Sequence, residues 1–310
     1  MAGLPLISIV TPSYQQGRFL EWTIRSVLLQ RYPNLEYVVM DGGSTDQTQG
    51  ILERYKPYFA HVESQPDRGH ADAVARGFTH THGEIMAFLN SDDLLAPGAL
   101  EFAARAFTAD PAIDAIYSHR VFIDENNTVG SYWILPPHNN WLMKRWDYIP
   151  QETCFWRRRI YEAIGGIDPS YKFGLDYDFF IRFMNRGRMR RVNRFLGAFR
   201  LHPPSPVGYV SRQREMTAGL REGQVHPEVE RARKQNGVWF PPKQWVAELA
   251  LHRWVERQSR RFVANREVLP GALPGVGYNY DQVWDGQLNE TPLADARGSV
   301  SESEPRPPSG

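Results

Sequence analysis

Short apolar runs alternate with segments of helical spacing through the first third of the chain. The apolar runs predict four buried strands, at residues 6–11, 35–40, 60–64 and 85–89. Apolar positions three and four residues apart predict three helices, at residues 19–30, 71–78 and 97–107. Strands that alternate with helices indicate an α/β fold with a Rossmann-like, mostly parallel sheet flanked by helices.

A further helix is expected after the second strand. Residues Ser44 to Gln47 read Ser-Thr-Asp-Gln, the spacing of a capping box, and would open a helix that ends near Tyr55. Structural roles then account for Ser44, Asp46 and Gln47. Asp41, which directly follows the strand, stays a candidate ligand.

The amino-acid composition changes twice in the rest of the chain. After about residue 206, segments rich in Arg, Glu and Gln lead to a helical stretch at 244–266, and the last twenty residues are mainly Pro, Ser, Glu, Gly and Ala. We therefore predict four parts. They are two halves of one domain at 1–110 and 111–205, a mostly helical extension at 206–290, and a disordered tail at 291–310.

The net charge and the cysteine content limit the classes of protein to which the chain can belong. The formal net charge of +1 over 310 residues predicts no broad basic face for nucleic acid. Cys154 is the only cysteine, so no intrachain disulfide can form, and it is interpreted as a small packed residue. The N-terminal residues lack the basic and apolar regions of a secretory signal, and no apolar run is long enough to span a membrane. We therefore expect a cytoplasmic protein.

Carboxylates gather where the predicted strands end. Asp41, Asp67 and the pair Asp92-Asp93 follow three of the four strands, whose carboxyl ends meet at one edge of a parallel sheet. Like charges repel there unless a cation or a donor-rich ligand offsets them. The run LNSDD at residues 89–93 therefore suits Mg²⁺ or Mn²⁺, which take oxygen ligands. A solvated, strand-ending turn explains the same run, and only the shared edge favours a metal.

Other polar residues could act on a phosphate or a hydroxyl. Asp176 and Asp178 open an amphipathic helix, where the helix dipole explains both and a rigidly placed general base is the functional alternative. Arg68 and His70 could contact phosphate or could belong to an ordinary loop before a helix. A lone histidine such as His202 is more often structural than metal-binding.

Taken together, these segments resemble glycosyltransferase family 2 and its GT-A fold over residues 5–205. The resemblance lies in the order of six segments, ISIVTPSYQQGRFLEWTIRSVLLQRYPNLEYVVMDGGSTDQT, SQPDRGHADAVARGF, GEIMAFLNSDD, IPQETCFWRRRIYEAIGGID, GLDYDFFIRF and FRLHP. It implies a metal-dependent, inverting enzyme that transfers a sugar from a nucleoside-diphosphate sugar to an acceptor hydroxyl, in polysaccharide or glycan biosynthesis. Residues 1–110 would bind the nucleotide sugar, and residues 111–205 would bind the acceptor and supply the catalytic base.

The resemblance also implies roles for single residues. Asp176 would be the catalytic base, and Asp92 with His202 would hold the divalent metal, Mg²⁺ or Mn²⁺. The nucleotide would be bound by Thr11, Pro12, Tyr14, Asp41, Asp67 and Ser91. Secondary contributions would come from Asn90, Asp93, Asp178, Gln151 and Arg68. The acceptor side would be shaped by Gln151, Glu152 and Gly165-Gly166.

Three positions depart from the family pattern. Asn90 replaces the first carboxylate of the acidic motif, Gly42 replaces an acid often found after Asp41, and Ala75 stands where many relatives carry asparagine. None of these changes removes Asp92 or Asp176, so activity is still expected.

The expected partners are a nucleotide-sugar donor and a glycan or lipid-linked acceptor. The alternatives are a non-catalytic nucleotide-sugar-binding protein on the same fold and a nucleotidyltransferase. A nucleotidyltransferase would carry a glycine-rich, basic loop after the first strand, where residues 12–16 read PSYQQ.

Aromatic and arginine residues alternate through the segment 244–266. Such a helix could lie on an anionic membrane at its inner face, near lipid-linked acceptors. It could also pack its aromatic side on the catalytic domain, and this second interpretation is the one we favour.

Overall fold

A computed structural model describes residues 3–145, 148–202, 226–239, 244–273 and 275–289. The strands are β1 (Ile7–Ser13), β2 (Leu35–Asp41), β3 (His61–Ser64), β4 (Ile85–Phe88), β5 (Leu94–Leu95), β6 (Ala115–Ile123), β7 (Val129–Trp133), β8 (Phe155–Arg157) and β9 (Met189–Arg200). The α-helices are α1 (Gly17–Leu28), α2 (Thr48–Tyr55), α3 (His70–Thr79), α4 (Ala99–Ala109), α5 (Asn140–Met143), α6 (Arg158–Ala163), α7 (Leu175–Arg186), α9 (Pro227–Gln235) and α10 (Gln244–Ala264).

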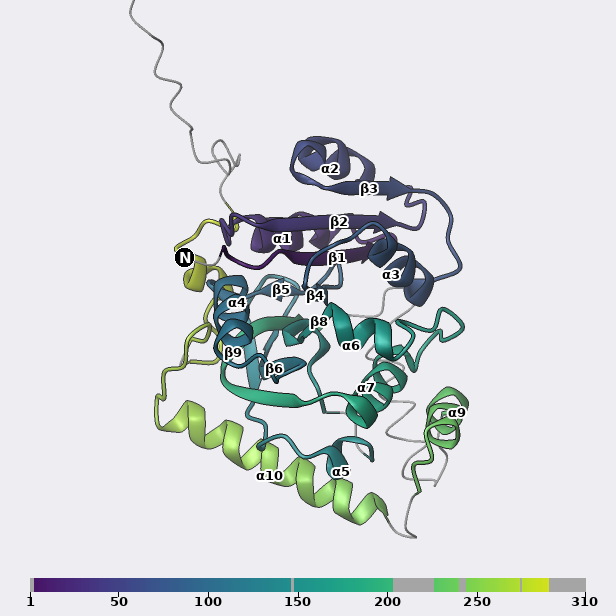
Figure 1. The fold of residues 1–310 in the computed structure, drawn as a ribbon. Coiled ribbons are helices and arrows are strands. Elements are labelled where there is room, and N and C mark those ends of the chain that lie inside the picture. The colour runs from purple at the N-terminus through teal and green to yellow at the C-terminus, as the bar shows by residue number, and fades with distance from the viewer. Residues whose placement is uncertain (1–2, 146–147, 203–225, 240–243, 274, 290–310) are drawn as a thin grey trace, which may run out of the picture.

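The strands form one sheet whose first part is parallel. Its order is β3-β2-β1-β4-β8-β6-β9-β5, with β7 beside β6 (Figure 1). Strands β3, β2, β1 and β4 are parallel neighbours, whereas β8 and β5 pair antiparallel with their neighbours. This arrangement confirms the α/β class, and it brings the carboxyl ends of β1, β2, β3 and β4 to the same edge.

Alternate side chains of the parallel strands point into two separate hydrophobic cores. Ile7 and Ile9 of β1 pack with α1, α2 and α4, whereas Val10 packs on the opposite face with α3 and α7. The two-residue period of a strand sends neighbouring side chains to opposite faces, so a strand covered by helices on both sides is apolar at nearly every position. The sheet is therefore fixed from both faces.

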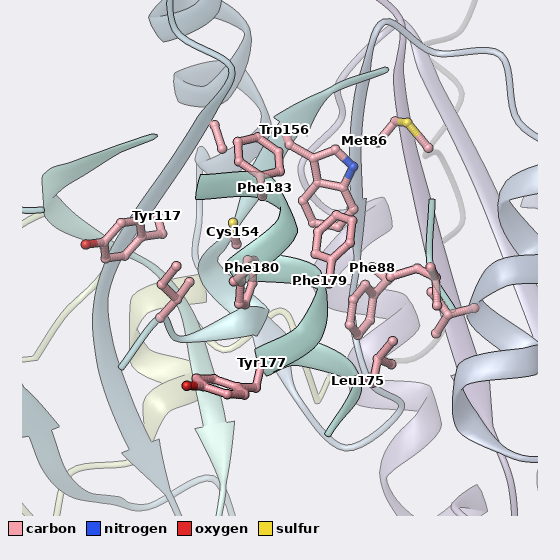
Figure 2. Close-up of a cluster of buried hydrophobic side chains, with 14 of the residues drawn as sticks. Met86, Phe88, Tyr117, Cys154, Trp156, Leu175, Tyr177, Phe179, Phe180 and Phe183 are labelled. Atoms are coloured by element: carbon pink, nitrogen blue, oxygen red, sulfur yellow. The ribbon is translucent and has the colours of Figure 1, made fainter. Parts of the chain in front are cut away.

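Helix α7 is held by an aromatic core beneath the end of β4. Phe179 and Phe183 of α7 lie against Trp156 of β8 and Phe88 of β4, as Figure 2 shows. The rings of Trp156 and Phe179 meet edge to face with centroids 5.0 Å apart. Cys154 is buried in the same cluster, as expected for a small packed residue. This core fixes the first turn of α7, which carries Asp176.

The end of α10 and the segment after it pack against strands β6, β7 and β9. Phe262, Tyr280, Trp284 and Leu288 pack in one cluster with residues of β6, β7 and β9. Residue Val129 also exchanges backbone hydrogen bonds with Tyr278 and Gly277. The described part of 206–290 consists of α9, α10 and a short 3-10 turn, η3 (Tyr280–Trp284), with connecting loops, and the predicted disordered tail lies outside the described residues. Within the described residues, every helix is too short or too polar to cross a membrane.

Two helix starts differ from the sequence prediction. The capping box at 44–47 does not form, because the Ser44 hydroxyl donates to Asp41 and the Asp46 carboxylate accepts from Gly17 and Thr48 at the starts of α1 and α2. Asp46 thus caps two helices, and α2 begins only at Thr48. Helix α4 begins at Ala99, because Gly98 is in a left-handed conformation with φ of 71°.

Candidate active site

The acidic turn at residues 90–93 follows β4 and is fixed by β9. The backbone N–H of Arg200 donates to Asp93 Oδ1 (3.0 Å), and its Nε donates to the Asp92 carbonyl (2.8 Å). Burial raises the pKa of Asp93 well above its usual value, and the charges of Asp92 and Glu152 raise it further. Asp93 is therefore a buried part of the turn, while the Asp92 side chain remains 24% exposed.

Asp92 and His202 come together from distant parts of the chain. His202 Nε2 lies 3.1 Å from Asp92 Oδ2, and the imidazole packs on the Phe19 ring with centroids 4.8 Å apart. Both side chains are partly exposed, at 24% for Asp92 and 14% for His202. One carboxylate oxygen and one imidazole nitrogen at this separation can share a divalent cation such as Mn²⁺. The structure therefore pairs the two residues that the sequence predicts as metal ligands.

Asn90 connects the acidic turn to two other segments. Its Oδ1 lies 2.8 Å from His70 Nε2 at the start of α3, and its Nδ2 donates to Gln151 Oε1 at 3.4 Å. Gln151 is buried and donates to the Phe88 carbonyl of β4 (2.6 Å). An amide can donate and accept at once, whereas the carboxylate usual in the family can only accept when ionised. Asn90 therefore supports the site through hydrogen bonds on both sides.

Asp176 lies in the first turn of α7 with an unusual carboxyl group. Burial raises its pKa to about 7, with Glu152 raising it further and Arg120 opposing the change. Its Oδ1 is buried and has no hydrogen-bond partner in the described structure. A carboxyl group with a pKa near neutrality and an unused acceptor atom has the properties of a general base.

A buried ion pair joins the acidic turn to Asp176. Arg120 of β6 donates from Nε (2.8 Å) and Nη2 (2.7 Å) to the two oxygens of Glu152, and the two side chains are 8% and 1% exposed. The charges of both residues act on Asp93 and on Asp176. Arg120 and Glu152 are therefore close enough to influence both the acidic turn and the proposed base.

The residues predicted to bind the nucleotide differ in exposure, because some side chains are open to solvent and others are buried. Tyr14 is 55% exposed, and its ring lies with the Asp67 carboxylate beside Gly42, since a Cβ on Gly42 would come 3.2 Å from Tyr14 Cδ2 and 3.0 Å from Asp67 Oδ2. An acid at position 42 would crowd Asp67. Glycine at position 42 leaves room for Tyr14 and Asp67 to lie side by side there.

Two residues predicted to contact the nucleotide are closed off. The Asp41 carboxylate is 97% buried and accepts from Ser44, Ser64 and Gln49, so its oxygens organise the loop after β2. The side chain of Thr11 is fully buried, with its hydroxyl 3.1 Å from that of Tyr37. Both side chains are buried and hydrogen-bonded within the protein in this structure, and their roles as nucleotide contacts stay predictions.

The remaining predicted residues have mixed environments. Arg68 is exposed and donates to Asp72 at the start of α3. Asp178 is buried and paired with Arg182 (2.7 Å), which in turn donates to the Gly166 carbonyl. Asp178 therefore anchors α7 to the preceding loop and does not face the site. Pro12 is buried near the end of β1, and Ser91 is buried in the turn after β4.

Sequence reasoning missed Arg120 and Arg200. Arg120 lies in an apolar strand with no motif around it, and its guanidinium stacks over Phe199 at 4.5 Å. Arg200 belongs to the FRLHP segment and lies two residues before His202. That position was the available signal for Arg200, and Arg120 had none.

Comparison with known proteins identifies the family. Residues 8–165, about half of the chain, match the family model described as glycosyl transferase family 2. An uncharacterized glycosyltransferase of Mycobacterium tuberculosis is 28% identical over 187 residues, which are 59% of this chain and 70% of the relative. The chondroitin synthase of Escherichia coli is 26% identical over 62% of this chain, but the match spans only 28% of that protein.

Solved structures of similar fold extend beyond the matched region. Staphylococcus aureus TarS 1–349 in complex with UDP-GlcNAc has a TM-score of 0.56 at 18% identity, covering 66% of this chain and 61% of TarS. The mannosyltransferase PcManGT of Pyrobaculum calidifontis, in complex with GDP-Man and Mn²⁺, has a TM-score of 0.54 at 20% identity, covering 87% and 78%. Together with the family match, these likenesses show that the chain belongs to glycosyltransferase family 2 and is a transferase with the GT-A fold.

Proposed function

We propose that the protein is a metal-dependent, inverting glycosyltransferase that transfers a sugar from a nucleoside-diphosphate sugar to an acceptor hydroxyl. One observation carries the proposal. Asp92 and His202 pair in the acidic turn region, and the buried Asp176 carboxyl, whose pKa is raised to about 7, is influenced by the same Arg120–Glu152 pair that acts on Asp93 of that turn. A non-catalytic sugar-nucleotide-binding protein would gain nothing from a carboxyl held in this state.

The residues fit a divalent cation. Asp92 and His202 would hold it, and their oxygen and nitrogen donors suit Mn²⁺ as well as Mg²⁺. When bound, the cation offsets the negative charge that develops on the departing nucleoside diphosphate. The Mn²⁺ in the complex of PcManGT supports this assignment. Arg200 keeps the turn in place by binding the main chain of Asp92 and the side chain of Asp93.

Asp176 would take the proton of the acceptor hydroxyl. Its unused Oδ1 offers an acceptor to that hydroxyl, and a pKa near neutrality lets the group both accept and release a proton at physiological pH. Attack by the activated hydroxyl opposite the leaving group inverts the anomeric carbon in a single displacement. The aromatic core under α7 holds the base in position throughout.

Nucleotide sugars are the proposed donors. UDP-GlcNAc and GDP-Man are bound in the similar structures of TarS and PcManGT, and Tyr14 with Asp67 forms the open part of the nucleotide side in this chain. The chondroitin and hyaluronan synthases among the relatives support a glycan or lipid-linked acceptor in polysaccharide synthesis.

We also propose that α10 contacts an anionic membrane near such an acceptor. Val255, Ser259 and Phe262 of α10 are buried against the domain, which agrees with the favoured packing interpretation. The opposite face of the helix carries exposed arginines at 253, 257, 260 and 261. Side chains at 244–249 lie outside the described residues. A helix that packs with one face leaves the other available for lipid head groups, as expected of a cytoplasmic enzyme at the inner membrane face.

Substitutions on α7 separate catalysis from stability. Asp176→Asn should lower kcat by about 10²-fold or more at unchanged donor affinity, because the general base is lost while the site is preserved. Asp178→Asn is the matched control. It should keep kcat and lower the free energy of unfolding by up to about 3 kcal/mol, because it leaves Arg182 without its buried partner. Transfer kinetics and chemical denaturation measure the two effects.

Asp92→Ala tests the metal side of the same site. It should weaken Mn²⁺-dependent binding of UDP-GlcNAc or GDP-Man at least about tenfold, a loss already typical of removing an outer-shell partner. Near-normal turnover in Asp176→Asn, or Mn²⁺-dependent donor binding unaffected by Asp92→Ala, would refute the assignment.

The raised pKa of Asp176 predicts the pH dependence of transfer. Only the ionised carboxylate accepts a proton, so kcat/KM should rise about tenfold per pH unit below about pH 7 and level off above it. The folded protein binds this proton more tightly than the unfolded chain. The stability contributed by the protonated group should therefore be lost as pH rises from about 4 to about 7. Asp176→Asn should abolish this part of the stability profile, and a kcat/KM that is flat below pH 7 contradicts the role.

Liposome flotation tests the membrane contact. Replacing Arg253, Arg257, Arg260 and Arg261 by glutamine should lower binding to phosphatidylserine vesicles more than about tenfold, at about 1 kcal/mol per basic residue. The control carries glutamine at four other exposed arginines, Arg31, Arg54, Arg105 and Arg188. Equal vesicle binding by the two variants would mean that the arginine face of α10 does not contact the membrane.

A further inference from the structure

A carboxylate from the helical extension lies at the start of α7. Glu228 belongs to the first turn of α9, which lies beside α7 (Figure 1). Its Oε2 accepts hydrogen bonds from the backbone N–H groups of Phe173 (2.7 Å) and Gly174 (2.8 Å). The backbone N–H of Lys172 donates to Oε1 of the same carboxylate (3.0 Å). Three successive N–H groups therefore converge on one side chain, just before Asp176 in the chain.

Helix α7 has no side-chain cap of its own at this end. Gly174 is its N-cap residue and has no side chain that could accept from the first N–H groups of the helix. Successive N–H groups before a helix carry partial positive charge and bind an anion. Burial acts to raise the pKa of Glu228, but the three N–H groups hold this pKa below its usual value, so the side chain is ionised at physiological pH. Glu228 therefore supplies from another helix the anion that the start of α7 lacks.

The two helices approach closely at this point. A Cβ on Gly174 would come 3.3 Å from Glu228 Cβ, so a glycine leaves room for α9. Ala232, four residues further along α9, is fully buried in the hydrophobic core that also contains Phe179 of α7. The Glu228 carboxylate is therefore placed by the packing of α9 on the domain as well as by its own hydrogen bonds.

Two tyrosines on either side of Gly174 extend the contact. The guanidinium of Arg231 lies 3.7 Å from the centre of the Tyr171 ring, and Arg233 Nε donates to the Tyr177 hydroxyl (3.1 Å). Both arginines belong to α9. Helix α9 therefore holds the chain before, at and after the N-cap position of α7.

The placement of Asp176 depends on this backbone. Its Oδ1 is buried and has no hydrogen-bond partner in the described structure, so the first turn of α7 sets the direction of that oxygen. We propose that Glu228 is a positioning residue for Asp176, which it holds in place by fixing the backbone of residues 172–174. This inference rests on the proposed function of Asp176 as the base. It makes α9, in the extension at 206–290, a part of the catalytic unit.

Hydrogen exchange tests the backbone contact without an activity assay. Glu228→Ala should speed exchange of the amides at 172–174 at least about tenfold, because each hydrogen bond to a charged group is worth more than a factor of ten. Glu228→Gln keeps one acceptor oxygen and should give an intermediate rate. Glu230→Ala is the matched control on the same helix turn, since it removes an exposed carboxylate paired with Lys234, and it should leave these amides unchanged. Unchanged exchange in Glu228→Ala overturns the proposal.

Transfer kinetics test the positioning role. Glu228→Ala should lower kcat about tenfold or more, since displacing a catalytic group by about 1 Å can cost that much or more. KM for the donor should stay unchanged, because the residues proposed to bind the donor lie on other elements. Glu228→Gln should recover part of kcat, and Glu230→Ala should match the wild type.

A merely structural role gives a different result. It would lower the amount of folded enzyme, measured by titration with the donor, and leave kcat per donor-binding site unchanged. That outcome, in an enzyme that Asp176→Asn inactivates, overturns the positioning role alone. Near-normal turnover in Asp176→Asn would instead disprove the proposed function on which this role rests.

Discussion

The buried ion pair between Arg120 and Glu152 is the interaction on which the rest of the site depends. Its charges act on carboxyl groups in both the acidic turn after β4 and the first turn of α7. A buried pair gives little net stability, because desolvation offsets much of the attraction. The pair instead fixes the positions of its two charges. The guanidinium of Arg120 is surrounded by the rings of Phe122, Trp133 and Phe199, so neither charge can move without exposing aromatic surface.

Around this pair, each element of the site has a separate support. Arg200 ties the acidic turn to β9, and the aromatic core around Trp156 fixes α7. Asp178, which resembles a catalytic residue in sequence, serves this second support through Arg182. Two neighbouring aspartates on one helix turn therefore differ in environment, since Asp178 is paired with Arg182 and Asp176, the proposed base, keeps an unpartnered oxygen.

Much of the fold could be predicted from the sequence, because alternation and strand-end chemistry are local signals. The four strands and the helices between them follow from patterns of a few residues, whereas the joint role of Asp92 and His202 is implied only by the family resemblance. The environment of a side chain is not local. Asp41 looks like a ligand in sequence, but hydroxyl and amide groups from three other positions occupy its oxygens. The environment of Arg120 depends on which strands become neighbours, which no short motif encodes.

The central claim is that Asp92 and His202 together hold a divalent cation beside the base. Pulsed EPR of the protein with Mn²⁺ and UDP measures this directly through the coupling of the electron spin to a ligand nitrogen. The account predicts a nitrogen coupling in the wild type that disappears in His202→Gln and persists in His80→Gln. A nitrogen coupling that survives His202→Gln, or its absence from the wild type, would contradict the account.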